Sequence, residues 1–453
     1  WSPIVLDSEL DDIVLESQAE VDDQVWHRGI SMWIDSQDKI HVSYNERYSQ
    51  RYITNKDGDW LMTWINDHTS DASTSLLIDS QDKIYISWYW YGYTRGWLYY
   101  VDNTNGSFST SYKVDDMFYN MEYLDSALDS NYKVHSVYVN HDQTLSYATN
   151  TSGSWIKEVI DDRTNTAQTR KDPKYVSIAV DSNNYIHISY IDAFEVLNYI
   201  TNKSWSWVRE EINNTTLWLH NSIVIDSNDY VYIAYYDSTS DDLKYITNKS
   251  GSWIDTTIDS DWDVGYLVSM DIDSQDALHI SYLDRTNDNI KYATNKWWSW
   301  IIWNVASQWW WWEWYTTSIA LDSNNNPHIA YYYCDTSYNN SLNYVATAPI
   351  YETSGTYTSS IYDTGENIKF NNIEWIENIP EGTTIQIKVR TSNDSSMSSA
   401  ADWSTCNIVS NGEDISLNSC VNDWDKYIQY QVYMSTWDIS LTPSLDKVSI
   451  TYN

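Results

Sequence analysis

A short apolar segment ending in Asp-Ser recurs seven times along the 453-residue chain, and this repeat constrains the fold more than any other feature. The copies read SMWIDS, SLLIDS, SALDS, SIAVDS, SIVIDS, SMDIDS and SIALDS. Their aspartates, at intervals of 44 to 52 residues, are Asp35, Asp79, Asp129, Asp181, Asp226, Asp273 and Asp322. A repeat of this length built only from strand-like segments is typical of a β-propeller with one blade per repeat.

Each repeat divides into four predicted strands. In the fourth copy they are SIAVDS, IHISYID, LNYITN and SWVREEIN, and the continuous apolar run of the first is expected of an innermost strand. The seventh copy stops after its third strand, SLNYVAT, while DIVLESQAEVDD supplies an extra strand before the first copy. We therefore predict an all-β fold in which residues 1–347 form a seven-bladed propeller closed by the N-terminal strand.

The pattern changes at Ala348, where strands with alternating polarity follow at wider spacing. Residues 348–453 are therefore predicted to form a separate β-sandwich of jelly-roll-like type. Cys406 and Cys420 lie in this segment and are a candidate disulfide, which leaves Cys334 unpaired. No run of 18 apolar residues is present to span a membrane, and we expect an extracellular or cell-surface protein.

The formal net charge of −38 excludes nucleic acids and anionic membranes as partners of most of the surface. It is compatible with a medium rich in salt or calcium. Asp322, Asn324 and Asn326 have the spacing of a calcium loop and form the candidate calcium site. Asx-turn chemistry explains the same turn in the other copies, so the spacing alone leaves both interpretations open.

The segment TNKSGSW (residues 247–253) resembles the Asp-box of BNR-type propellers, which include sialidases and several lectin-like proteins. The matching positions in three copies are Asn55, Gly58 and Trp60, then Asn150, Gly153 and Trp155, then Asn248, Gly251 and Trp253. The resemblance covers about residues 1–347 and implies a propeller, although the spacing departs from the strict Asp-box. The C-terminal part is similar to accessory sandwich domains of secreted, carbohydrate-active proteins.

Tryptophan and glycine exchange places between copies of the repeat. The turn between the third and fourth strands has glycine in four copies, whereas Trp205 and Trp298 occupy the same place in two others, and Trp314 aligns with Gly265. Glycine adopts positive φ without a Cβ clash, and tryptophan does so poorly. With 12 Gly and 27 Trp in the chain, we interpret Trp205, Trp298, Trp309 to Trp312 and Trp314 as glycine in the native protein. The rival interpretation is a genuine aromatic patch.

The loops between the second and third strands and between successive repeats form the variable face, where we place the candidate ligand site. Its members are of three kinds: Arg28, Arg47, Arg95 and Arg285; Asp192, Asp237 and Asp284; Trp26, Tyr175, Trp218 and Tyr266. Arginine binds carboxylates and aromatic rings stack on sugars. The alternatives are that the arginines pair within the protein, that the aspartates cap their loops, and that the aromatics, with Tyr123, plug the channel mouth.

These features predict a secreted, non-catalytic binding or adhesion module whose partner is a glycan or a cell-surface polymer. No catalytic set is fixed by the sequence, because the Phe-Arg-Ile-Pro signature of sialidases, a Ser/His/Asp order and a Cys/His metal spacing are all missing. The first alternative is a sialidase-like glycoside hydrolase or lyase, and the second is a structural surface-layer or filament subunit. Five histidines share one repeat position with tyrosine and are interpreted as structural: His41, His135, His187, His279 and His328.

Overall fold

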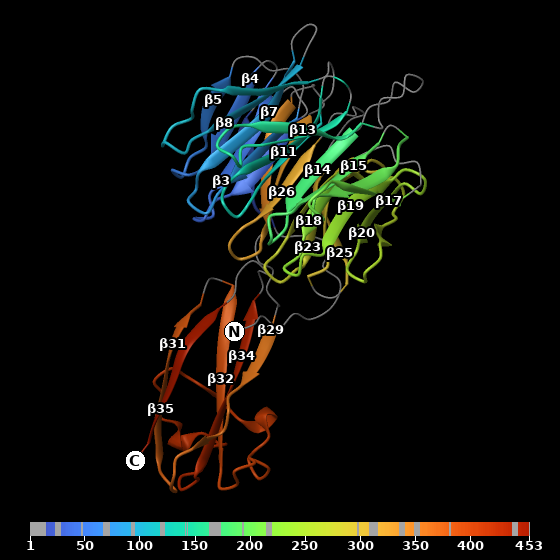
Figure 1. Cartoon of the computed structure of the whole chain (residues 1–453). Helices are drawn as coiled ribbons and strands as arrows, with labels where there is room; N and C mark the ends of the chain where they lie inside the picture. The colour runs from blue at the N-terminus through green and yellow to red at the C-terminus, as the bar shows by residue number, and fades with distance from the viewer. Residues whose placement is uncertain are drawn as a thin grey trace. The chain divides into compact units, whose positions relative to one another are not determined.

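In the computed structural model, the regular secondary structure of the described residues is almost entirely β-strand. The described residues are 15–22, 29–46, 49–66, 73–91, 96–117, 123–140, 142, 144–162, 174–192, 194–213, 220–296, 299–307, 316–334, 340–347, 354–379, 382–436 and 443–452. The chain divides into two compact units, of which the first is Leu15–Thr347 and the second includes Ala348–Asn453 (Figure 1). None of the helical segments in the described part of the chain is long and apolar enough to cross a membrane.

Seven four-stranded antiparallel sheets make up the first unit. The first sheet comprises β2 (Ile30–Ile34), β3 (Ile40–Glu46), β4 (Ser49–Thr54) and β5 (Leu61–Asn66). The second comprises β6 (Thr74–Ile78), β7 (Ile84–Tyr91), β8 (Gly96–Asp102) and β9 (Tyr112–Met117). The third sheet comprises β10 (Leu124–Leu128), β11 (Val134–Val139), β12 (Leu145–Thr149) and β13 (Ile156–Asp161). The fourth comprises β14 (Lys174–Val180), β15 (Ile186–Ile191), β16 (Leu197–Thr201) and β17 (Val208–Asn213). The fifth sheet comprises β18 (Asn221–Ile225), β19 (Val231–Asp237), β20 (Asp242–Thr247) and β21 (Ile254–Asp259). The sixth comprises β22 (Val264–Ile272), β23 (Leu278–Asp284), β24 (Asn289–Thr294) and β25 (Ile301–Ser307).

The seventh sheet joins the two ends of this unit. It contains β26 (Thr317–Leu321), β27 (Pro327–Cys334), β28 (Asn340–Thr347) and, as its fourth strand, β1 (Leu15–Asp22). β1 runs antiparallel to β28, with Gln18 opposite Val345 and Ala19 opposite Tyr344. This pairing gives the last sheet its outer strand, as in the other six sheets.

The first strands of the seven sheets contact one another in a closed cycle, β2, β6, β10, β14, β18, β22, β26 and again β2. The arrangement is propeller-like. Serine hydroxyls join these strands by accepting hydrogen bonds from backbone N–H groups of the neighbouring sheet. The donor–acceptor pairs, at 2.9 to 3.3 Å, are Met32–Ser318, Leu76–Ser31, Ser126–Ser75, Ile223–Ser177, Met270–Ser222 and Ile319–Ser269. Each bond satisfies a backbone donor that lies in the interior of the unit.

Asp125 takes the place of serine at the remaining junction, between β10 and β14. It lies four residues before Asp129, as Ser177 lies four residues before Asp181. Its carboxylate accepts hydrogen bonds from the N–H and hydroxyl groups of the next sheet, from Ile178 and Ser177 at 3.1 Å. Burial raises the pKa of Asp125 to about 6.

The turns after the first strands form a second ring of hydrogen bonds. Ser36 donates through its N–H and its hydroxyl to the Asp82 carboxylate of the next sheet, at 2.9 Å each, and Ser323 donates to Asp38 in the same way at 2.8 Å. The residue at the acceptor position has positive φ in all seven turns: Asp38, Asp82, Tyr132, Asn184, Asp229, Asp276 and Asn325. Asp and Asn tolerate this conformation, which explains their frequency there.

The five repeated histidines are structural, as predicted. His187 contacts the Tyr199 hydroxyl through Nδ1 at 2.6 Å and the Asp181 carboxylate through Nε2 at 3.2 Å. Where the repeat has tyrosine, the hydroxyl of Tyr85 donates directly to Asp79 at 2.8 Å. Burial lowers the pKa of His41, His135 and His187.

Two structural groups of tryptophans bear on the exchange with glycine. In the first group an indole packs against a tyrosine of the preceding sheet, with ring centroids 5.1 to 5.7 Å apart: Trp60 on Tyr344, Trp155 on Tyr100, Trp207 on Tyr147, Trp253 on Tyr199 and Trp300 on Tyr245. In the second group the backbone has positive φ and the side chain is exposed: Trp205, Trp262 and Trp424. Trp298, Trp309 to Trp312 and Trp314 lie outside the described residues.

The second unit contains two sheets that share one apolar core. The larger has the order β29 (Ser354–Thr358), β34 (Tyr427–Thr436), β32 (Thr383–Ser392) and β33 (Ile408–Val409), with β30 (Tyr362–Asp363) also paired to β34. The smaller pairs β31 (Phe370–Asn378) with β35 (Ser444–Tyr452). Phe370 and Ile373 of one sheet lie in the same core as Ile387, Val389 and Val432 of the other. Two short 3-10 turns, η1 (Trp403–Thr405) and η2 (Ile415–Leu417), belong to the connections.

Candidate functional site

A central cavity of about 1140 Å³ is lined by the first strands of all seven sheets. Its walls are formed mainly by the serines of the inner ring and by small or apolar side chains such as Leu77, Ala179 and Val224. At the end opposite the Asp-Ser turns, Tyr236 from the end of β19 and the loop residues Ser238 and Arg285 join the lining. The antiparallel order of the strands places this end on the variable face that the sequence analysis selected.

Four rings from four consecutive sheets form an arc at this mouth of the cavity. The centroids of Tyr123 and Tyr175 are 4.6 Å apart, those of Tyr175 and His220 are 4.4 Å apart, and those of His220 and Tyr266 are 6.1 Å apart. Each residue stands at or just before the start of a first strand. Neighbouring rings are tilted by 51 to 56° to one another, so the arc is not one flat platform.

His220 is the member of the arc that the sequence analysis missed. It lies two residues before Ser222, as Tyr175 lies two residues before Ser177. Among the described residues, its ring makes aromatic contacts but no hydrogen bond or ion pair. Burial lowers its pKa to about 3, so the imidazole is neutral and offers one donor and one acceptor to a ligand.

Arg285 ends the arc and is the cationic residue of the cavity lining. Its guanidinium lies 4.8 Å from the centroid of the Tyr266 ring and pairs with the Asp263 carboxylate, with Nη1 and Oδ2 3.2 Å apart. The side chain remains 38% exposed. Ion pairing to Asp263 holds one edge of the guanidinium, and the other N–H groups can reach a ligand.

Tyr236 connects the arc to two carboxylates. Its hydroxyl lies 2.7 Å from Oδ1 of Asp241 and 2.9 Å from Oδ1 of Asp263. Burial and these two negative charges raise the pKa of Tyr236 well above its ordinary value. The phenol therefore stays protonated and donates a hydrogen bond, whereas a tyrosine nucleophile must lose its proton.

The three predicted ligand-binding aspartates are buried within their own sheets. Asp192 accepts hydrogen bonds from the N–H groups of Phe194 and Val196 and pairs with Arg209 at 2.9 Å. Asp237 pairs with Lys244 at 2.6 Å and Asp284 pairs with Lys291 at 3.3 Å, and each also accepts bonds from its loop. All three have the geometry of loop caps.

The other predicted residues are divided between the arc and the undescribed part of the chain. Tyr175, Tyr266 and Arg285 are brought together at the cavity mouth. Arg28, Arg47, Arg95, Trp26 and Trp218 lie outside the described residues. Three of the predicted residues, together with His220, Tyr236 and Ser238, therefore line this mouth of the cavity.

Carboxylates that line the cavity are engaged by the backbone. Asp125 is held at the junction described above, and Asp271 accepts hydrogen bonds from the N–H groups of Ile272 and Leu321 at 2.8 and 3.1 Å. Burial raises the pKa of Asp271 also. These contacts tie both carboxylates to the inner strands.

The calcium candidate has the hydrogen bonds of an Asx turn. Asp322 accepts from the N–H groups of Asn324 and Asn326 through Oδ1 and from the Asn326 side chain through Oδ2, at 2.8 to 2.9 Å. Asp181 makes the same two backbone bonds in its own turn. Within the described ranges, no group of three or more His, Cys, Asp or Glu residues has the geometry to hold a metal ion.

Comparisons with known proteins establish similarity of fold. No family model matches the sequence, and no curated protein matches it. A fungal alcohol oxidase of the AA5 family, solved in complex with copper, is 9% identical, covers 97% of this chain and 99% of its own, and gives a TM-score of 0.52. An identity this low supports the shared all-β fold and carries no inference about activity.

Two further solved structures match part of the chain with lower scores. The alpha-L-arabinofuranosidase from Fusarium graminearum, in complex with an iminosugar inhibitor, is 12% identical over 74% of this chain and 98% of its own, with a TM-score of 0.45. A mutant lectin from Aleuria aurantia, in complex with alpha-methyl-L-fucoside, is 11% identical over 64% of this chain and 97% of its own, with a TM-score of 0.43.

Proposed function

We propose that this chain is a secreted, seven-bladed Asp-box-like propeller followed by a β-sandwich, and that it binds a glycan without catalysing a reaction. The observation that carries the proposal is the cavity mouth, where the arc of Tyr123, Tyr175, neutral His220 and Tyr266 ends at the partly exposed Arg285. Sugar hydroxyls need donors and acceptors held beside aromatic surface, and this set supplies both.

The hydrogen bonds that the lining carboxylates already accept favour a binding function over glycoside hydrolysis. Hydrolysis needs one carboxyl group to donate a proton and a second group to act as base or nucleophile. The lining carboxylates Asp125 and Asp271 are occupied by backbone N–H groups, and Tyr236 is held as a donor. In the described part of the cavity lining, these contacts leave Arg285 and His220 as the groups best suited to contact a polar ligand.

The test is a glycan array with the full chain, followed by titration of each retained glycan and by turnover assays on it. We expect a retained glycan class without turnover. Arg285→Gln should weaken binding by about tenfold or more, since it removes charge-assisted hydrogen bonds. Lys203→Gln is the matched control, because Lys203 is an exposed cation in the turn between β16 and β17, at the opposite end of the sheets.

Turnover that is lost in Arg285→Gln would replace the binding proposal with a sialidase-like hydrolase or lyase. Equal effects of the two substitutions would place the ligand elsewhere. Absence of any retained glycan, together with concentration-dependent assembly in light scattering, would instead support a structural surface-layer or filament subunit.

A further inference from the structure

The outer face of the larger sheet in the second unit differs in charge from the rest of this acidic protein. Ile387 and Val389 of β32 and Val432 of β34 point into the core, so the residues that alternate with them lie on the other face. These residues are Gln386, Lys388 and Arg390 on β32, with Gln429, Gln431 and Tyr433 opposite them on β34. These six strand residues are two cations, three amides and a tyrosine, with no carboxylate among them.

Arg390 is held rigidly on this face by neutral groups. Its guanidinium lies 4.3 Å from the ring centroid of Trp403. Nε and Nη2 both donate to Oε1 of Gln429, at 3.2 and 2.7 Å, and Nη1 donates to the Ala401 carbonyl oxygen at 3.3 Å. A guanidinium has five N–H groups, so two remain for a ligand.

Lys388 adds a second cation two residues before Arg390. Its ammonium group donates to the carbonyl oxygen of Trp403 at 2.8 Å. Within the described ranges, no carboxylate lies within ion-pair distance of Lys388 or Arg390, whereas Lys369 pairs with Asp423 and Lys426 pairs with Asp363. The charge of Asp402, on the bordering loop, acts on both cations without forming an ion pair with either. Two adjacent cations that make no direct ion pair are unusual on a chain whose net charge is −38.

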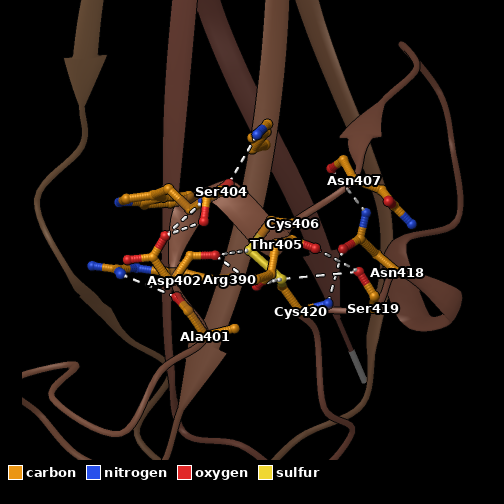
Figure 2. Close-up of a disulfide and its surroundings, with 12 residues drawn as sticks. Arg390, Ala401, Asp402, Ser404, Thr405, Cys406, Asn407, Asn418, Ser419 and Cys420 are labelled. Carbon is orange, nitrogen blue, oxygen red and sulfur yellow. Dashed lines mark hydrogen bonds between the residues drawn. A yellow bond between two sulfur atoms is a disulfide. The ribbon is translucent and has the colours of Figure 1, made fainter.

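The disulfide fixes the loop that borders these cations. Figure 2 shows Arg390 beside Ala401 and Asp402, next to the bond between Cys406 and Cys420. Asp402 caps η1 by accepting from the N–H of Ser404 at 2.9 Å, and Thr405 donates to the Asp402 carbonyl oxygen. The loop therefore presents Ala401 and Trp403 to Arg390 in one arrangement, which limits the entropy lost when a ligand binds.

We propose that this face binds an anionic polysaccharide, with its carboxylate or sulfate groups held by Arg390 and Lys388. Tyr433, which is 41% exposed, and Gln386 continue the face along the strands beyond the two cations. Side chains on one face of a strand repeat about every 6.8 Å, so this row spans more than one sugar ring and suits a chain rather than a single sugar. The site is separate from the cavity of the first unit and does not depend on the function proposed there.

The experiment measures the Kd of the full chain for polygalacturonate, dextran sulfate and neutral dextran at about 0.15 M salt, where charges beyond about 8 Å are screened. We expect binding of at least one polyanion and none of neutral dextran. Binding of polygalacturonate alone identifies carboxylate as the recognised group, and binding of dextran sulfate alone identifies sulfate.

Substitutions on and off this face test whether binding depends on these two cations or only on the net charge of the chain. Lys388→Gln and Arg390→Gln are each expected to weaken polyanion binding by about fivefold or more, and together by about 25-fold or more. Lys369→Gln makes the same change in net charge at a paired cation and should leave the Kd within about twofold. Thermal unfolding checks that each variant is folded, and Lys388→Gln remains informative if Arg390→Gln is not.

Two results would overturn the proposal. One is failure of the unsubstituted chain to bind either polyanion. The other is an equal loss of affinity in Lys369→Gln and Lys388→Gln, which would mean that any cation on the chain serves. Loss of cavity binding in Arg285→Gln with unchanged polyanion binding would confirm that the two sites are independent.

Discussion

The backbone N–H of Trp205 donates to the carbonyl oxygen of Asn202 at 2.9 Å and closes the turn between β16 and β17. Gly251 makes the same bond to Asn248 in the next sheet, also at 2.9 Å. Both residues have positive φ, +68° for Trp205 and +85° for Gly251. Because the Trp205 side chain is 90% exposed, it contributes little packing to offset the strained backbone.

This relationship predicts that the native protein has glycine at position 205. Trp205→Gly should raise the free energy of unfolding by about 1 kcal/mol, because glycine adopts positive φ without strain. Thermal or denaturant unfolding measures the change, and tandem mass spectrometry of the native peptide identifies the residue directly. The same assignment is expected for Trp262 and Trp424, which share positive φ and exposure.

The neighbouring Trp207 is the control for that prediction. Its ring packs at 5.1 Å on Tyr147, and its indole N–H donates to Glu158 at 2.9 Å. Trp207→Gly should lower the free energy of unfolding by about 3 kcal/mol or more, since it removes this contact between sheets. If native peptides show tryptophan at 205, 262 and 424, the glycine interpretation is wrong and these residues form exposed aromatic surface.

Asp125→Ser tests the exception in the inner ring. Serine occupies the equivalent position of the other six sheets and can accept the same bond from Ile178. The folded-state pKa of Asp125 is raised to about 6, from an ordinary value of 3.8. Its contribution to stability is therefore fully present below about pH 4 and is lost as the pH rises through 6. The variant should gain about 2 to 3 kcal/mol over the unsubstituted chain between pH 4 and pH 7.

Chemical unfolding of both proteins at a series of pH values measures this difference. Ser222→Ala serves as the comparison, because it deletes a bond to the Met270 N–H without changing a charge. It should cost about 1 kcal/mol at every pH. A constant difference between Asp125→Ser and the unsubstituted chain across this range would contradict the proposed role of burial.

The repeat located the Asp-Ser turns and the four strands of each copy, because Asx turns and strand alternation are local properties. Contacts between sheets were harder to predict. The link from Ser323 to Asp38 joins residues far apart in the sequence, and no local pattern indicates it. The third copy, SALDS, is one residue shorter than the others when its first serine is aligned with theirs. Asp125 directly precedes that serine and therefore fell outside the aligned repeat.

The residues of the candidate site were likewise predictable only in part. Tyr175, Tyr266 and Arg285 were found because they precede or follow predicted strands on the variable face. Asp192, Asp237 and Asp284 have the same kind of position, but their loops turn the carboxylates inward to lysine and arginine. Whether such a carboxylate faces a ligand or its own loop depends on side-chain contacts that the strand pattern does not determine.

Removal of the Cys406–Cys420 bond should affect the second unit and spare the first. The bond closes a loop with a sequence separation of 14, for which loop-closure entropy predicts about 3 kcal/mol of stabilisation. Calorimetry of a Cys406→Ser, Cys420→Ser variant should show a lower melting temperature only for the transition of the second unit. An unchanged transition would mean that the hydrogen bonds of the loop suffice without the disulfide.

His187→Tyr and His187→Leu test the buried histidines. Tyrosine takes this position in two sheets, where its hydroxyl donates to the turn aspartate, so His187→Tyr should cost less than about 1.5 kcal/mol. Leucine would leave the Asp181 carboxylate and the Tyr199 hydroxyl without this partner and should cost about 3 kcal/mol.

The pH dependence of these variants has a definite sign. The folded-state pKa of His187 is lowered from 6.5 by burial, so the native state favours the neutral ring and loses stability as the pH falls below about 6.5. Both variants lack this titration, and their stability relative to the unsubstituted chain should therefore improve on acidification. Urea unfolding at pH 7.5 and pH 5 measures the change, and a relative stability that worsens at pH 5 would show that His187 is protonated in the folded protein and paired with Asp181.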